Sequence, residues 1–177
     1  ERAYEDDYLN SVHYTDRCLG RFFDQIKSKG FWDNSLFVLI ADHGVVGPEK
    51  IGYTKARRYQ IPMVWTGGAL NVRDTVVNPY TSQVDLAATL LNQLDVEASG
   101  FKFSKNVLDE GVKGFSFLHY PDGFGYIDED VFQMYDKTSL KPLEMYEAIT
   151  RKDSLKAKVF MQMLAKDFKE RLTHGKE

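Results

Sequence analysis

Asp42 and His43 are adjacent in the sequence, directly before Gly44 and directly after an apolar run at residues 36–41. A carboxylate oxygen and an imidazole nitrogen together suit Zn²⁺ or Mn²⁺, and the carboxylate alone suits Mg²⁺. Because glycine lets the chain turn sharply, both side chains can face one ion. The pair therefore predicts part of a metal site. An ordinary capping aspartate beside a loop histidine stays open as an alternative, because a catalytic ion usually has three or more protein ligands.

Basic side chains are frequent in the polar stretch that follows, residues 42–60, where Lys50, Lys55, Arg57 and Arg58 occur. Such side chains can hold an anion, for example a phosphate or sulfate ester, although a solvated loop has the same composition. The chain contains no G-x-x-x-x-G-K phosphate loop, no G-x-G-x-x-G dinucleotide motif and no G-x-S-x-G nucleophile elbow. The basic stretch is therefore a candidate anion contact outside these well-known motifs, and a solvated loop stays open as the alternative.

The composition is typical of a folded domain with a real core. Of 177 residues, 43% are hydrophobic, and 23 basic against 26 acidic residues give a net charge of −3, so nothing points to a nucleic-acid partner. No apolar run approaches the roughly 18 residues that a membrane-spanning helix needs. The single cysteine excludes an intrachain disulfide and a cysteine-built zinc site. Cys18 is interpreted as a packing residue, and His13 as a surface or hydrogen-bonded histidine. His119 falls in the predicted meander, and His174 in a tail that is expected to fray.

Hydrophobic spacing predicts the elements that position the Asp-His pair. A helix is expected over residues 4–29, with Gly30 as its stop. The unbroken apolar run at 36–41 is typical of a strand buried on both faces of a parallel sheet. A second strand is expected at 61–66. A deeply packed helix that begins with a capping side chain is expected over 81–94.

The hydrophobic pattern changes in the last third of the chain, where short strands and turns are expected. Three short strands around residues 115–118, 126–127 and 131–135, with a turn at 121–125, predict a small antiparallel meander. A final helix is expected over 154–172. Its predicted buried face consists of Leu155, Val159, Met163, Leu164, Phe168 and Leu172.

A series of motifs follows in order along residues 4–136: Tyr8–Asp16, Leu19–Phe22, Trp32–Leu36, Ala41–Gly44, Gln60–Trp65, Gln83–Leu91, Phe103–Leu108 and Asp122–Gly125. In this order they closely resemble the sulfatase-like proteins of the alkaline phosphatase superfamily. Within them, they are most similar to bacterial membrane-anchored phosphoglycerol transferases related to lipoteichoic acid synthase. The resemblance implies an α/β fold, an α/β/α sandwich with a mostly parallel sheet, of which this chain is the C-terminal portion.

Three regions are expected within that portion. Residues 1–100 are expected to be the C-terminal part of the α/β catalytic domain. Residues 101–150 are expected to form a small antiparallel β subregion. Residues 151–177 are expected to form a C-terminal helix.

The resemblance also implies a divalent metal that activates a threonine nucleophile, with Mn²⁺ first and Mg²⁺, Zn²⁺ or Ca²⁺ as alternatives. Asp42 and His43 match the metal-binding Asp-His pair of the family. The nucleophile, an acidic ligand and a substrate-binding histidine are expected upstream of this chain. Cys18 is followed by Leu-Gly-Arg and does not match the C-x-P-x-R context of a sulfatase nucleophile.

Gln60 departs from the pattern, because many relatives carry histidine at this position before Ile-Pro. Glutamine is a poor ligand for Zn²⁺ or Mn²⁺. Gln60 is therefore assigned to substrate binding rather than to the metal. Lys50 and Arg57 of the basic stretch are assigned to substrate binding as well.

The function expected for the full-length protein is metal-dependent hydrolysis or transfer of phosphate (phosphoglycerol) or sulfate esters through a covalent intermediate. The substrate would be a lipid or glycan head group, and the enzyme would lie at the extracytoplasmic (periplasmic) face of a bacterial inner membrane, anchored by segments upstream. The fragment alone is expected to be inactive and able to self-associate. The alternative is a non-catalytic structural or partner-binding lobe of a degenerate family member.

Overall fold

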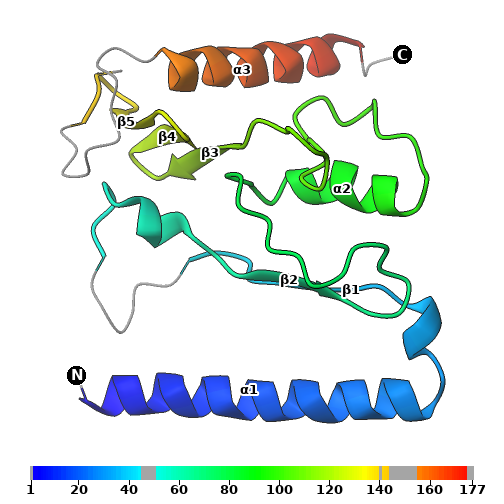
Figure 1. Cartoon of the computed structure of the whole chain (residues 1–177). Coiled ribbons are helices and arrows are strands. Elements are labelled where there is room, and N and C mark those ends of the chain that lie inside the picture. The colour runs from blue at the N-terminus through cyan, green and yellow to red at the C-terminus, as the bar shows by residue number, and fades with distance from the viewer. Residues whose placement is uncertain (1, 45–50, 140, 144–154, 175–177) are drawn as a thin grey trace. The chain divides into compact units, whose positions relative to one another are not determined.

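A computed structural model describes residues 2–44, 51–139, 141–143 and 155–174 (Figure 1). The chain divides into two compact units. The first comprises residues 1–52 and 57–75, and the second comprises residues 53–56 and 76–177. Each is described by itself.

The first unit begins with the long helix α1 (Arg2–Ser28), which ends where the sequence predicts. Gly30 has a φ of 73°, and its N–H donates to the carbonyl oxygen of Lys27 at 3.1 Å. The N–H of Phe31 reaches back to the carbonyl oxygen of Ile26, also at 3.1 Å. These two bonds form a Schellman motif, which satisfies carbonyl groups that the helix itself leaves unpaired.

Aromatic side chains join α1 to the strand that carries the Asp-His pair. The short 3₁₀ helix η1 (Trp32–Asn34) leads into strand β1 (Phe37–Ile40). The ring of Phe37 lies 5.3 Å from that of Phe23 and 5.8 Å from that of Phe22, both edge-on, and 5.7 Å from the stacked ring of Trp32. Edge-to-face and offset pairs of this kind add to the stabilisation that burial gives.

Strand β1 pairs with β2 (Met63–Thr66) in an antiparallel register from Phe37↔Thr66 to Ile40↔Met63. The expectation of a parallel partner for this strand is wrong. A parallel pair needs a crossover connection, usually a helix, whereas the described part of the connection holds only the 3₁₀ helix η2 (Ala56–Tyr59). The expected burial on both faces is also wrong, because a two-stranded sheet covers little surface and leaves Ile40 and Val64 exposed.

The second unit contains helix α2 (Asp85–Gln93), the three-stranded sheet β3 (Phe115–Tyr120), β4 (Gly123–Asp128) and β5 (Phe132–Asp136), and helix α3 (Lys156–His174). The strands follow the order β3-β4-β5 and are antiparallel throughout, which confirms the predicted meander. The hairpin loop is shorter than the sequence indicates, because Gly123 already belongs to β4. A Cβ atom there would lie 2.0 Å from the carbonyl oxygen of Tyr135, so the close strand pairing requires glycine.

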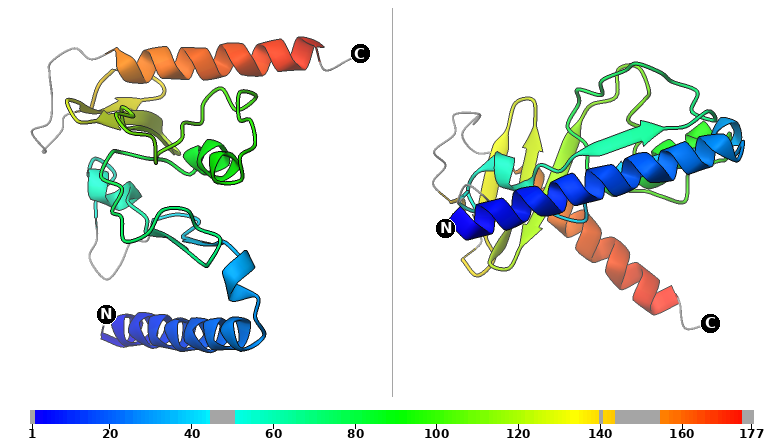
Figure 2. Two further views of the ribbon diagram at one scale, coloured as in Figure 1. Left: turned by 45° about the vertical axis from the view of Figure 1, so that its right-hand side comes forward. Right: turned by 90° about the horizontal axis from the view of Figure 1, so that it is seen from below.

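Helix α3 lies along one face of this sheet and extends past its strands (Figures 1 and 2). Ala157 is buried with Phe124 and Tyr135 in the core of the unit. Five of the six residues of the predicted buried face are instead exposed: Leu155, Val159, Met163, Phe168 and Leu172. Apolar residues occur almost all round this helix, so their spacing does not identify the side that packs.

Helix α2 is shorter than expected and is buried mainly along one side. It begins at Asp85. Its N-cap residue Val84 makes no side-chain hydrogen bond; instead the carboxylate of Asp85 accepts from the backbone N–H of Ser82 at 2.9 Å. Asp85, Ala88 and Thr89 are buried. Leu94, just past its end, is exposed.

Candidate metal centre after strand β1

Asp42 and His43 lie directly beyond the last residues of β1, as the sequence predicts. The Nε2 atom of His43 lies 3.6 Å from Oδ2 of Asp42, and the two side chains are 78% and 88% exposed. The backbone N–H of His43 donates to Oδ1 of Asp42 at 2.9 Å. This contact holds the carboxylate beside the imidazole while Oδ2 faces the ring.

The His43 ring is oriented by its own chain. Its Nδ1 atom lies 3.0 Å from the carbonyl oxygen of Gly44. Because a carbonyl oxygen only accepts hydrogen bonds, this contact favours the tautomer with the proton on Nδ1. The lone pair of the neutral ring is then on Nε2, the atom beside Asp42. In metal sites of proteins, a backbone carbonyl commonly orients a histidine ligand in this way.

These two residues fit a divalent ion as two of its ligands. A separation of 3.6 Å between Nε2 and Oδ2 lets both atoms approach one ion at about 2.0–2.2 Å. The donor set, one nitrogen and one carboxylate oxygen, suits Mn²⁺ or Zn²⁺. Within the described residues, no three His, Cys, Asp or Glu side chains gather into a larger cluster. Among the described residues, Asp42 and His43 thus bring two candidate ligand atoms together, without a third beside them.

Gly44 brings the basic stretch close to this pair. A Cβ atom at Gly44 would lie 2.2 Å from the carbonyl oxygen of Arg58, so glycine is required for the two backbones to approach. Arg58 is half-buried, and its Nη1 donates to the carbonyl oxygen of Ile51 at 2.5 Å, which braces the loop. Arg57 and Gln60 are exposed, and the backbone N–H of Gln60 donates to the carbonyl oxygen of Arg57 at 3.3 Å.

The remaining sequence candidates lie elsewhere or outside the described residues. Lys50 falls in the segment that is not described. Cys18 is half-buried on α1, where His13 is exposed. His119 is exposed on β3, and the side chain of His174 is not described.

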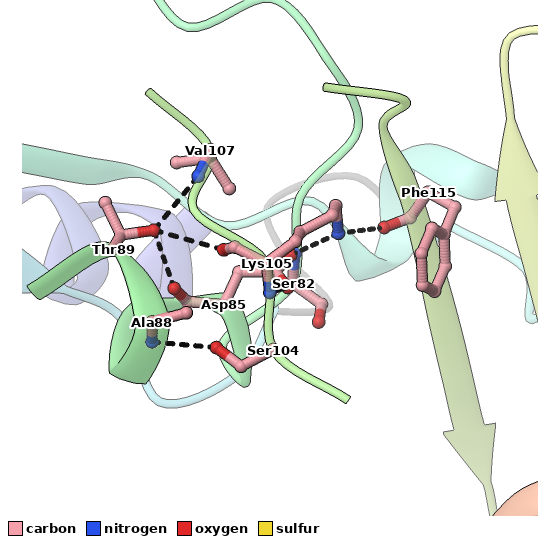
Figure 3. Close-up of polar contacts among 8 residues, drawn as sticks. All are labelled: Ser82, Asp85, Ala88, Thr89, Ser104, Lys105, Val107 and Phe115. Atoms are coloured by element: carbon pink, nitrogen blue, oxygen red, sulfur yellow. Dashed lines mark hydrogen bonds and ion pairs between the residues drawn. The ribbon is translucent and has the colours of Figure 1, made fainter. Parts of the chain in front are cut away.

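A buried ion pair in the second unit was not found by sequence reasoning (Figure 3). Asp85, which is 1% exposed, accepts hydrogen bonds from the N–H of Ser82 at 2.9 Å and from the N–H of Lys105 at 3.1 Å. The ammonium group of Lys105 lies 2.5 Å from Oδ2 of Asp85 and also donates to the carbonyl oxygen of Phe115 at 2.9 Å. It lies 4.2 Å from the centroid of the Phe115 ring. Both charged groups of the pair are therefore hydrogen-bonded, which a buried charge requires.

Hydroxyl groups extend this network along α2. Thr89 Oγ1 donates to the carbonyl oxygen of Asp85 at 2.7 Å and accepts from the N–H of Val107 at 3.1 Å. Ser104 Oγ accepts from the N–H of Ala88 at 2.8 Å (Figure 3). Together these bonds fix segment 104–107 between α2 and β3. The only local signal for them in the sequence was an aspartate at the start of an apolar helix.

Comparisons with known proteins agree with the resemblance of the motifs. The model of the Sulfatase family matches residues 2–96, which is more than half of the chain. Lipoteichoic acid synthase 2 of Bacillus subtilis is 30% identical over 112 residues, which cover 56% of this chain and 17% of that protein. Lipoteichoic acid synthase of Staphylococcus aureus is 23% identical over 126 residues, which cover 62% of this chain and 19% of that protein.

A solved structure shares the fold. A protein in the alkaline phosphatase superfamily from Vibrio parahaemolyticus superposes with a TM-score of 0.60 at 25% identity, covering 86% of this chain and 41% of that one. The expected α/β fold class is thereby confirmed. The chain spans about a fifth of the length of the curated relatives it matches. In the described parts of the chain, no helix combines the length and apolar character needed to cross a membrane. With its ordered motifs, its fold and the match over residues 2–96, the chain belongs to the Sulfatase family of the alkaline phosphatase superfamily.

Proposed function

We propose that this chain is the C-terminal part of a metal-dependent, sulfatase-like enzyme that hydrolyses or transfers phosphate (phosphoglycerol) or sulfate esters through a covalent intermediate. The observation that carries the proposal is the pairing of His43 Nε2 with Asp42 Oδ2 across 3.6 Å beyond the end of β1. The sulfatase match and the lipoteichoic acid synthase relatives support the reaction class.

Asp42 and His43 would hold the ion, for which we propose Mn²⁺, with Mg²⁺, Zn²⁺ or Ca²⁺ as alternatives. When bound, such an ion polarises the oxygen of the transferred group and lowers the pKa of a hydroxyl nucleophile. The carbonyl oxygen of Gly44 keeps the His43 ring in the tautomer that presents Nε2. We assign contact with the anionic substrate to Arg57 and Gln60, which are exposed on the neighbouring loop, and to Lys50, which lies outside the described residues.

The nucleophile and the other metal ligands are proposed to come from protein outside these 177 residues. The small share of the lipoteichoic acid synthases that this chain covers, 17% and 19%, supports that view. The 177-residue chain alone is then expected to show no turnover. We place the whole enzyme at the extracytoplasmic (periplasmic) face of a bacterial inner membrane, acting on a lipid or glycan head group.

One feature favours a second candidate, a non-catalytic structural or partner-binding lobe. Gln60 occupies the position before Ile61-Pro62 at which the family resemblance calls for histidine. A site that has lost one anion contact or ligand retains less affinity for its metal. The affinity of Asp42 and His43 for a divalent metal distinguishes the enzyme from the non-catalytic lobe.

The test is a calorimetric titration of the 177-residue chain with Mn²⁺. We expect weak binding that Asp42→Asn or His43→Gln reduces by at least about tenfold, because each variant removes one of two ligands. His13→Gln and Asp16→Asn are matched controls, since they change the same residue types at exposed positions on α1. Unchanged Mn²⁺ affinity in both site variants would favour the non-catalytic lobe. Metal-dependent hydrolysis of a phosphodiester by this chain would show that the nucleophile has been misplaced.

A further inference from the structure

The second unit contains a groove of about 410 Å³ between α3, strands β3 and β4, and the segment 102–105. It is an open groove rather than an enclosed cavity, so an occupant keeps one side in water. Its described lining consists of Lys102, Phe103, Ser104, Lys105, Phe115, Tyr126, Lys156, Val159, Phe160 and Met163. Neither Asp42 nor His43 is part of it.

Aromatic rings form a preassembled apolar wall. The ring of Phe160 on α3 lies 5.4 Å from that of Phe115 and 5.8 Å from that of Phe103. Phe115 in turn stacks on Tyr126 with a centroid separation of 5.5 Å. Rings that already pack against one another need little reordering when a ligand arrives, which favours binding.

Two aliphatic side chains of α3 complete this wall and are still open to water. Val159 is 48% exposed and Met163 is 52% exposed, one helical turn apart. Covering them with hydrocarbon removes apolar surface from water, which favours binding. The groove therefore favours an occupant with an apolar chain.

The charges at the groove are arranged asymmetrically. The ammonium-bearing side chains of Lys102 and Lys156 are 61% and 46% exposed, whereas their carboxylate partners Asp167 and Asp128 are 14% and 12% exposed. None of the described lining residues is an aspartate or glutamate. A molecule that enters the groove therefore meets positive charge first.

The phenol at the groove adds no opposing charge. Burial, followed by the charge of Asp128 and a hydrogen bond to it, raises the pKa of Tyr126 to about 12. A tyrosine is already neutral at physiological pH with its ordinary pKa of about 10, and the raised pKa keeps Tyr126 a neutral ring. An anionic head group meets no like charge from this side chain.

We propose that this groove binds a single-chain anionic amphiphile. Its hydrocarbon chain lies against Phe115, Phe160 and Met163, and its head group lies beside the ammonium groups of Lys102 and Lys156. The proposal does not rest on the metal pair or on the proposed enzymatic reaction.

Calorimetry on the 177-residue chain tests the ligand chemistry, with probes kept below their critical micelle concentrations. We expect decyl phosphate to bind at least about tenfold more tightly than decyltrimethylammonium, with decyl maltoside between them. Inorganic phosphate, which lacks the chain, is expected not to bind. Equal affinity for the anionic and cationic probes would overturn the proposal, as would binding of phosphate alone.

Matched variants test the location. Met163→Glu places a carboxylate in the groove, and Met161→Glu makes the same change at an exposed position of α3 that does not line it. We expect M163E to weaken binding of decyl phosphate by at least about tenfold and M161E to change it by less than about twofold. Equal effects of the two variants would contradict the assigned site.

A second pair of variants makes smaller changes to the chain and serves as the test if M163E does not fold. Lys102→Gln removes one groove ammonium, whereas Lys166→Gln removes an exposed ammonium that pairs with Glu170 away from the groove. Only K102Q is expected to lower the affinity for decyl phosphate, by about three- to tenfold, while the affinity for decyl maltoside stays the same. Unchanged binding of decyl phosphate to K102Q would contradict the role of the charge.

Discussion

At the scale of single residues, the buried pair Asp85–Lys105 contributes more to the stability of the fold than its place in the sequence indicates. Asp85 is 2% exposed at its side chain and Lys105 is 16% exposed. A charge left alone in such a site is strongly destabilising, because neither water nor a counter-ion compensates it. The pair, with the carbonyl oxygen of Phe115 as a third partner, ties α2 to the start of β3.

We predict that Lys105→Met lowers the free energy of unfolding by about 3–5 kcal/mol, because the Asp85 carboxylate loses its partner. The double variant Asp85→Asn, Lys105→Met should regain part of that loss, since no unpaired charge remains. Urea unfolding followed by circular dichroism measures both. Lys166→Met is the control, because the ion pair of Lys166 is exposed and should contribute little. A loss in K105M no greater than that in K166M would contradict the assigned role.

At the scale of elements, the placement of β1 depends on the aromatic ring that it presents to α1. Phe37 touches three rings, those of Phe22, Phe23 and Trp32. The backbone also contributes, since the N–H of Gly68 after β2 donates to the carbonyl oxygen of Trp32 at 2.9 Å. The strand that leads to Asp42 is therefore held by side-chain packing at its first residue.

We predict that Phe37→Ala loosens this packing and lowers the free energy of unfolding of the first unit by about 2–3 kcal/mol, below the 3–5 kcal/mol of a fully buried ring. The chain has two tryptophans, so a Trp65→Phe background leaves Trp32 as the reporter. Its emission should shift to longer wavelength when the stacked ring is removed. Phe31→Ala, at a more exposed ring outside the cluster, should leave the emission unchanged. An unshifted spectrum in F37A would contradict the packing role.

Features that depend on neighbouring residues were predictable from the sequence, and features that depend on distant contacts were not. The stop of α1 at Gly30 and the place of Asp42 and His43 just after a strand are local features, and both occur as expected. The antiparallel pairing of β1 was missed because an unbroken apolar run of six residues is typical of a parallel strand, whereas the direction of β1 is set by its contact with the distant strand β2. Asp85 and Lys105 are 20 residues apart, so the contact between them depends on the fold.

At the scale of the whole molecule, carboxylates with lowered pKa values make stability depend on pH. Burial of Asp128 favours its neutral form. The hydrogen bonds from Lys156, Asp130 N–H and Val131 N–H outweigh this effect, and the pKa of Asp128 is lowered. Hydrogen bonds from Ser139 lower the pKa of Asp136, and those from Arg171 and Lys102 lower that of Asp167. At low pH the unfolded chain therefore binds more protons than the folded one, so stability falls as pH falls.

Asp128→Asn isolates one part of this dependence. Its amide oxygen can still accept from the N–H groups of Asp130 and Val131, as Oδ1 of Asp128 does at 2.9 Å, while the charge that pairs with Lys156 is lost. We predict that the wild type is more stable near neutral pH and that the difference shrinks as the pH falls from about 5 towards 2, because the Asp128 carboxylate becomes protonated. Urea midpoints measured across this range check the prediction. Glu129→Gln, an exposed neighbour, should follow the wild-type curve, and a constant gap between wild type and D128N would show that the Asp128 charge does not stabilise the fold.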